Sequence, residues 1–215
     1  MAVVAVVAVV VALLAALLIA DRVAVIHAQG RMAARLGDQG FAARPQVTIA
    51  GFPFLTQLMA RRLNKVVISA ADAKLGPVEV KRLDVTLYGI RAIPGSNSRT
   101  ASRLSGTALV GFARLAGAGG MPGLAVCADG PDWVKITTAA LGLVTGTVTA
   151  RVTQAGPGGI RIAVISAGGI PVALGLMPDI TLSLPALSLA MTIQSASVTS
   201  QGVQLHLAGR NVRLG

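Results

Sequence analysis

The sequence predicts an α+β protein that is mostly β, preceded by a long apolar helix. Three observations support this class. Residues 1–20 carry no polar or charged side chain, and from about residue 45 the apolar residues recur with a period of two. Hydrophobic residues make up 53% of the chain, yet aromatic residues make up only 3%. Small and β-branched residues therefore supply the apolar surface, and β-branched residues favour strands.

Residues 1–20 predict a transmembrane segment. At a rise of about 1.5 Å per residue, a helix of this length spans about 30 Å, the thickness of the bilayer core. The run is longer than the apolar part of a typical signal peptide, and no clean small-residue cleavage site follows it. We interpret it as an uncleaved anchor, with a cleaved signal as the alternative.

The charges that flank this segment leave its orientation open. No Lys or Arg precedes it, whereas Arg22, Arg31 and Arg35 follow it. Taken alone, the positive-inside rule would place the rest of the chain in the cytoplasm. The missing basic residues also lead us to expect a start codon further upstream.

Two helices are expected in the first part of the chain after the apolar segment. Residues 22–36 carry a narrow apolar stripe at spacings of three and four, and Gly37 is a suitable stop. The stripe consists of Val25, Ala28, Met32 and Leu36. A second, short helix begins at Pro53, a residue that suits the first helical turn. Its apolar face holds Phe54, Leu55, Leu58 and Met59, and Gln57, Arg61 and Lys65 lie opposite.

Alternating patterns predict strands through most of the remaining chain. We expect strands at residues 46–49, 66–69, 78–87, 147–153, 160–164, 187–193 and 203–207, a bulge at Lys81–Arg82, and a third helix at 107–117. Residues 22–215 would form one domain built on a twisted antiparallel sheet. The apolar face of that sheet must be covered, and little helix is available to cover it. The patterns allow either a closed sandwich, slightly favoured on this ground alone, or a groove for an apolar ligand.

The net charge of +11 has two interpretations. Basic residues scattered over a solvated surface would need no partner. Alternatively, they attract an anionic partner such as lipid headgroups. Nucleic acid is not expected, because the basic residues form no long cluster and stacking aromatic residues are scarce.

The sequence offers no catalytic or metal-binding constellation. Asp129 and Asp132 flank Gly-Pro and are typical of a turn, and the two histidines, His27 and His206, belong to no motif. The single cysteine, Cys127, excludes an intrachain disulfide and is interpreted as a small core residue. We therefore predict no enzyme, no metal and no cofactor.

Two stretches carry a family resemblance. The first is residues 47–58, VTIAGFPFLTQL, followed by a strand from Lys65. The second runs from residues 182–187, LSLPAL, to the closing residues 207–214, LAGRNVRL. Over roughly residues 22–215 the chain resembles the LmeA-like phospholipid-binding family of actinobacterial cell envelopes.

The resemblance implies a fold similar to the TULIP or BPI-like lipid-binding domains, in which a curved antiparallel sheet wraps a long helix around an apolar channel. Phe52, Phe54, Leu55, Leu58 and Met59 would then line or gate the channel, or else only plug one end of the core. Arg61, Arg62 and Lys65 would meet phosphate or the membrane surface.

The function implied is non-enzymatic binding of a phospholipid such as phosphatidylinositol, on the outer, periplasmic side of the plasma membrane, in support of lipomannan elongation. The alternative is a scaffold that docks an envelope glycosyltransferase and holds no lipid.

Overall fold

The computed structural model describes residues 2–37, 44–75, 78–93, 95–96, 98–118, 125–140, 144–156, 159–168, 170–171, 180–183 and 191–214. Its elements follow one another as α1 (Ala2–Gly37), β1 (Gln46–Ala50), α2 (Phe54–Met59), β2 (Arg62–Leu75), β3 (Val78–Ala92), β4 (Arg99–Val110), α3 (Phe112–Ala118), β5 (Ala125–Ala128), β6 (Trp133–Ala140), β7 (Val144–Gln154), β8 (Gly159–Ala167), β9 (Ile170–Pro171), β10 (Ile180–Ser183), β11 (Met191–Thr199) and β12 (Gly202–Leu214).

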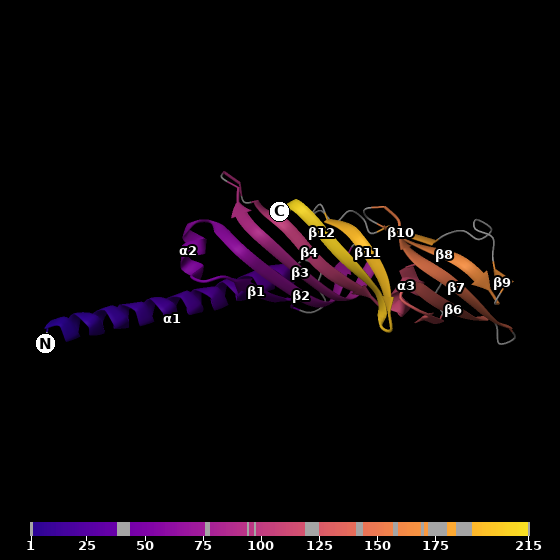
Figure 1. Cartoon of the computed structure of the whole chain (residues 1–215), viewed down its shortest axis with the longest axis horizontal. Helices are drawn as coiled ribbons and strands as arrows, with labels where there is room; N and C mark the ends of the chain where they lie inside the picture. The colour runs from indigo at the N-terminus through magenta and orange to yellow at the C-terminus, as the bar shows by residue number, and fades with distance from the viewer. Residues whose placement is uncertain are drawn as a thin grey trace.

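The described strands form two antiparallel sheets that succeed one another along the length of the molecule (Figure 1). Sheet A has the order β1-β2-β3-β4-β12-β11. Sheet B has the order β10-β8-β7-β6-β5, and β9 pairs with β8. The sheets meet at β11, where the Val198 N–H donates to the Pro131 carbonyl at 2.6 Å.

The long helix α1 has two parts with different surroundings. Residues 2–20 project from the body with every side chain exposed (Figure 1). The C-terminal part lies along sheet A, where Val25 and Ala33 are buried and Ala28 and Met32 pack against the core. This helix is the one described element long and apolar enough to cross a membrane.

The curved face of sheet A holds the core beside α1. Alternate residues of each strand face this core over part of its length, as in a half-buried antiparallel sheet, and the alternation is interrupted where the backbone has a positive φ. Val66 of β2, Leu87 of β3, Leu104 of β4 and Leu205 of β12 are all 5% exposed or less. The predicted class, a mostly β protein whose curved antiparallel sheet lies against a long N-terminal helix, is confirmed.

Several local predictions were wrong. Residues 107–117 do not form one helix, because β4 continues to Val110 and α3 begins only at Phe112. The pattern of Leu109, Phe112 and Leu115 suggested a helical face, but Gly111 separates a strand residue from two helix residues. Of the predicted strand 187–193, residues 187–190 lie outside the described part of the chain.

The bulge expected at Lys81–Arg82 is also absent. The pairs Ala71–Arg82 and Ala73–Val80 keep one unbroken register between β2 and β3. Instead, Asp72, opposite Lys81, has a φ of +48°. Both strands therefore change their buried face at the same place, which accounts for the parity shift in the sequence without an inserted residue.

Cys127 was likewise placed wrongly in the core. It lies on β5 at the margin of sheet B and is exposed. A short strand at the edge of a sheet leaves its outward side chains in solvent, whatever their polarity.

Candidate lipid-binding site

The turn between β1 and α2 is shaped by Gly51 and Gln57. Gly51 has a φ of +115°, and a Cβ at this position would collide with the Gln57 side-chain amide. That buried amide accepts a hydrogen bond from the Asn64 N–H at 3.0 Å and donates to the Pro53 carbonyl at 3.3 Å. The Phe52–Pro53 peptide is cis. These contacts fix α2 against the start of β2.

Helix α1 holds α2 from the other side through two consecutive residues. The Asp21 carboxylate is only 2% exposed and accepts a hydrogen bond from the Leu55 N–H at 2.8 Å. The first N–H groups of a helix have no partner within it, so this carboxylate satisfies one of them. The Arg22 guanidinium lies 5.3 Å from the centroid of the Phe52 ring, a cation–π contact.

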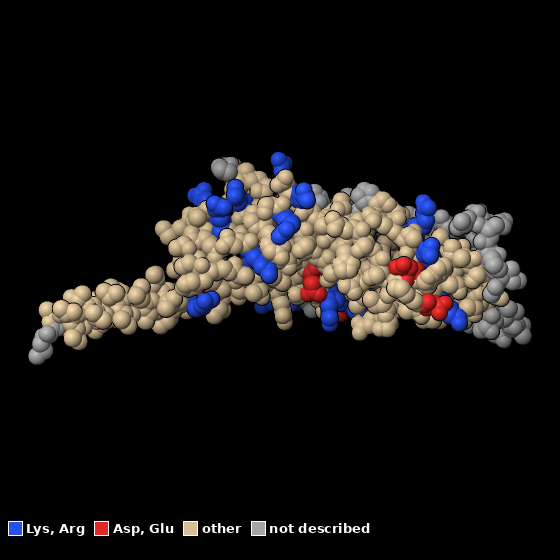
Figure 2. Space-filling model, viewed as in Figure 1, with Lys and Arg blue, Asp and Glu red and all other residues tan. Residues whose placement is uncertain are grey.

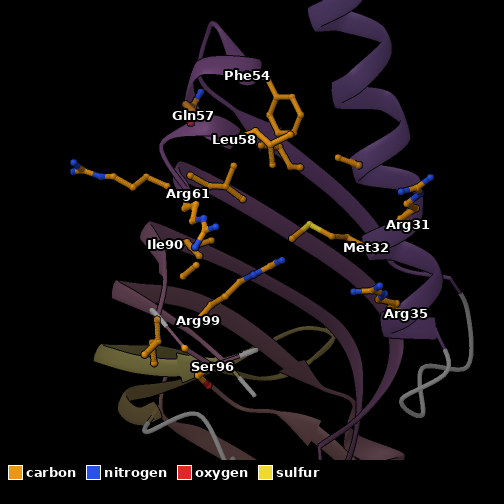
Figure 3. Close-up of a pocket in the computed structure, with 17 residues that line it drawn as sticks. Arg31, Met32, Arg35, Phe54, Gln57, Leu58, Arg61, Ile90, Ser96 and Arg99 are labelled. Atoms are coloured by element: carbon orange, nitrogen blue, oxygen red, sulfur yellow. The ribbon is translucent and has the colours of Figure 1, made fainter.

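A groove of about 480 Å³ opens between α1, α2 and the adjacent end of sheet A (Figure 3). This volume falls within the range of roughly 300–1,000 Å³ typical of small-molecule sites. Its wall is mostly apolar. The apolar lining consists of Ala28 and Met32 from α1, Ile49 from β1, Phe54 and Leu58 from α2, Leu63 from β2, Ile90 and Ala92 from β3, and Ile93.

Arginines supply the charge of this groove. Its lining includes Arg31, Arg35, Arg61, Arg62 and Arg99. All five are exposed, and no Asp or Glu is among the described lining residues. Because guanidinium groups stay protonated at any physiological pH, the groove is permanently cationic. Five arginines around an apolar wall suit a ligand that is apolar at one end and anionic at the other.

One end of the groove is apolar, and the remainder mixes apolar and basic side chains. In Figure 3, Phe54 and Leu58 lie toward the part of α1 that leads to the apolar segment, and Arg35, Arg99 and Ser96 lie toward the other end. Met32 and Arg99 point into the space between α1 and the sheet, whereas Arg61 extends away from it. An amphipathic ligand would therefore have its apolar part nearer the projecting half of α1.

Further basic residues cross the outer face of sheet A beside the groove. The strand registers place Lys65, Tyr88, Arg103 and Arg210 in one transverse row. A second row holds Arg62, Arg91, Thr100 and Arg213. Figure 2 shows basic side chains gathered over this end of the body, with the acidic ones further along the molecule. This end of the protein therefore carries a cationic surface outside the groove as well.

The structure places the residues singled out in the sequence at three kinds of position. Phe54, Leu58, Arg61 and Arg62 line the groove. Phe52 and Met59 are exposed, and Leu55 is half-buried beside Asp21. Lys65 lies on the outer face, with its Nζ 5.9 Å from the centroid of the Tyr88 ring.

The sequence did not lead us to predict the groove arginines that α1 and β4 supply. Arg31 and Arg35 are one helical turn apart and share a face with Ala28 and Met32, so this i, i+4 spacing was an available signal. Arg99 offered no comparable signal, because the strand that presents it was not predicted.

The acidic residues and the histidine of the strands that were considered as catalytic candidates lie at exposed positions. The described residues contain no group of three or more His, Cys, Asp or Glu side chains able to hold a metal ion. Asp129 and Asp132 are exposed in a turn, where the Asp129 N–H donates to the Trp133 carbonyl at 2.9 Å. His206 is exposed on β12, paired with Thr107 of β4.

Comparison with known proteins agrees with this geometry. The family model described as LmeA-like phospholipid-binding matches residues 19–208, which include α1 from just before Asp21, the groove, sheet B and all of sheet A except the end of β12. No curated protein and no solved structure matches the chain significantly. Since the family match covers most of the chain, the protein belongs to the LmeA-like phospholipid-binding family.

Proposed function

We propose that the groove binds one anionic phospholipid. Its phosphate would lie among the five arginines that line the groove, and the adjacent acyl carbons would lie against Met32, Phe54 and Leu58. The observation that carries the proposal is the set of five arginines around an apolar wall with no described carboxylate among them. Guanidinium groups bind phosphate through paired, charge-assisted hydrogen bonds.

The two parts of the ligand would contribute differently to affinity. Burial of acyl carbons stabilises by roughly 0.8 kcal/mol per CH₂ group. A basic residue near an anionic membrane adds about 1 kcal/mol, and salt screens that term. Acyl burial therefore supplies most of the affinity, and the arginines select the headgroup charge.

The apolar end of the groove supports one orientation of this lipid. Phe54 and Leu58 lie toward the projecting half of α1, and Arg35 and Arg99 lie further from it. With α1 anchored in a bilayer, a phospholipid could rise headgroup first while its acyl chains trail past α2 into the leaflet. The proposed action is thus partial extraction of a lipid from the membrane.

We further propose, from the family resemblance, that the protein is a non-enzymatic factor of an actinobacterial envelope. The domain would lie on the outer side of the plasma membrane and support lipomannan elongation, with phosphatidylinositol as the expected ligand. A scaffold for an envelope glycosyltransferase is the competing function, and it requires no lipid in the groove.

Native mass spectrometry of the full chain tests this proposal. The protein would be reconstituted in nanodiscs of equal phosphatidylcholine and phosphatidylinositol and then released in the gas phase. We expect about one retained phosphatidylinositol per chain. Arg35→Glu and Arg99→Glu should lose it, because each replaces a phosphate partner with a like charge.

Lys135→Glu is the matched control, since Lys135 is an exposed base on β6, in the other sheet. It changes the net charge equally and should retain the lipid. A folded wild-type chain that emerges without lipid would overturn the proposal and favour the scaffold.

A further inference from the structure

The exposed apolar surface of α1 does not end at the charged pair Asp21–Arg22. On the far side of that pair, Val23 is 51% exposed and Ile26 is 66% exposed. At about 1.5 Å per residue, the stretch from Val3 to Ile26 spans about 35 Å, somewhat more than the roughly 30 Å of a bilayer core. An excess of this size is one helical turn, which the membrane interface must accommodate.

Asp21 is buried against α2, and Arg22 is exposed but has a partner in the turn before α2. Asp21 is 2% exposed and bonds the Leu55 N–H, and Arg22 lies over the Phe52 ring. Charged side chains at membrane depth require a partner or a route to water. Both charges have a partner on α2 or on the turn before it, so they need not mark the edge of the bilayer.

Helix α2 and the turn before it present three exposed apolar side chains beside this pair. They are Phe52, Leu58 and Met59, and together they are called the α2 tip. Phe52 and Leu58 are 55% exposed, and Met59 is 85% exposed. They are the large hydrophobic side chains most exposed to solvent outside α1 among the described residues. An aromatic and two flexible aliphatic side chains at the end of a basic body suit insertion at a membrane interface.

The polar groups around this tip are largely satisfied within the protein. The Thr56 hydroxyl donates to the Pro53 carbonyl at 2.9 Å, and Gln57 bonds through both ends of its amide. The Ala60 N–H donates to the Thr56 carbonyl at 3.0 Å. Internal satisfaction of this kind lowers the cost of leaving water for a less polar medium.

We propose that α2 is embedded in the same leaflet into which α1 passes, so that the membrane boundary lies near Ile26–His27 and not at Asp21. The occupant of the α2 tip is the lipid bilayer. The inference requires α1 to remain as the anchor, but it does not depend on whether the groove holds a lipid. It also places Arg31 and Arg35, which follow His27 on α1, just outside the leaflet, so that the groove opens directly onto it.

Site-directed fluorescence on the full chain tests this placement. Cys127 is exposed and would itself react, so the background is Cys127→Ser. Met59→Cys is labelled with an environment-sensitive fluorophore after reconstitution in vesicles of three parts phosphatidylcholine to one part phosphatidylglycerol. Quenching is then compared between lipids spin-labelled near the headgroup and aqueous iodide.

Two reference sites calibrate the measurement. Ala16→Cys on α1 should report the bilayer core, and Ser200→Cys, in the turn between β11 and β12, should report water. We expect Met59→Cys and Ile26→Cys to be quenched by lipid and shielded from iodide severalfold relative to Ser200→Cys. A probe at Gly30, which has open space around it, should be accessible to iodide.

If positions 59 and 26 instead quench with iodide as Ser200→Cys does, the boundary lies at Asp21 and the inference is wrong. The same samples, analysed by mass spectrometry for retained phosphatidylglycerol, report separately on the groove. Failure of one proposal is thereby distinguished from failure of the other.

Discussion

The Asp21 carboxylate accepts a hydrogen bond from the backbone N–H of Leu55 at 2.8 Å, across 34 positions of the chain. It joins the helix that leaves the body to the helix that closes the groove. Its second oxygen, Oδ2, is buried and has no hydrogen-bond partner among the described residues. The Asp21 side chain therefore holds α2 through a single charge-assisted hydrogen bond, in addition to the contacts of Gln57 with Pro53 and Asn64.

Asp21→Ala should weaken the attachment of α2 to α1. Loss of a hydrogen bond to a charged group that caps a helix costs about 1 to 2 kcal/mol. Hydrogen exchange at the Leu55 amide, followed by mass spectrometry in detergent, should be fast in the variant and slow in the wild type. Asp129→Ala, at an exposed turn, is the control and should leave this amide unchanged. Equal exchange in all three proteins would show that the bond does not position α2.

Gly51→Ala should destabilise the turn before α2. The new Cβ would meet the Gln57 amide, and the φ of +115° is strained for any L residue, at about 1 to 3 kcal/mol. Thermal unfolding should show a lower midpoint. Gly111→Ala is the matched control, because its Cβ would meet nothing within 4 Å. A midpoint for Gly51→Ala equal to that of Gly111→Ala would contradict the geometry of the turn.

Arg210→Gln should stabilise the protein in the absence of anionic lipid. Arg210 and Arg103 are direct cross-strand partners between β12 and β4, and like charges so placed repel by roughly 0.2 to 1 kcal/mol. Chemical unfolding at low salt should show the gain, and high salt should abolish it. A loss of stability at low salt would mean that Arg210 has a favourable partner.

Ala28→Trp should fill the groove without changing its charge. Ala28 lines the groove from α1, and a tryptophan there would occupy the space of the acyl carbons. Lipid retention should fall while the unfolding midpoint stays near that of the wild type. His27→Trp places the same side chain on an exposed position of α1 and should retain lipid. Retention by both variants would place the lipid elsewhere.

The elements near the groove that the sequence predicted are those with unbroken periodicity. The stripe of α1 correctly included Ala28 and Met32, and the start of the helix after Pro53 was predicted within one residue. Its extension to Arg61 and Lys65 was wrong, because α2 ends at Met59 and Lys65 lies in β2. On α2, Phe54 and Met59 were assigned to one face, but a helix of six residues buries only a narrow strip. Phe54 lies in that strip, and Met59 lies outside it.

Strand β4 shows why the remaining part of the site was not predicted. Its buried residues Ala101, Leu104 and Ala108 are spaced by three and four, as in a helix. The change of face occurs at Ser102, which the registers align with Gly89 of β3 and Asn211 of β12, both at positive φ. A distortion shared by three strands is set by their pairing, which no single stretch of sequence contains.

Helix α1 runs from Ala2 to Gly37 without interruption, so its apolar N-terminal part and the wall of the groove belong to one continuous helix. A helix longer than the local bilayer is accommodated by tilting. Since no hinge separates the two parts, any tilt in the membrane would be transmitted to the groove and would change the angle at which it meets the leaflet. Bilayer thickness would then affect, through the tilt of α1, how readily a lipid enters the groove.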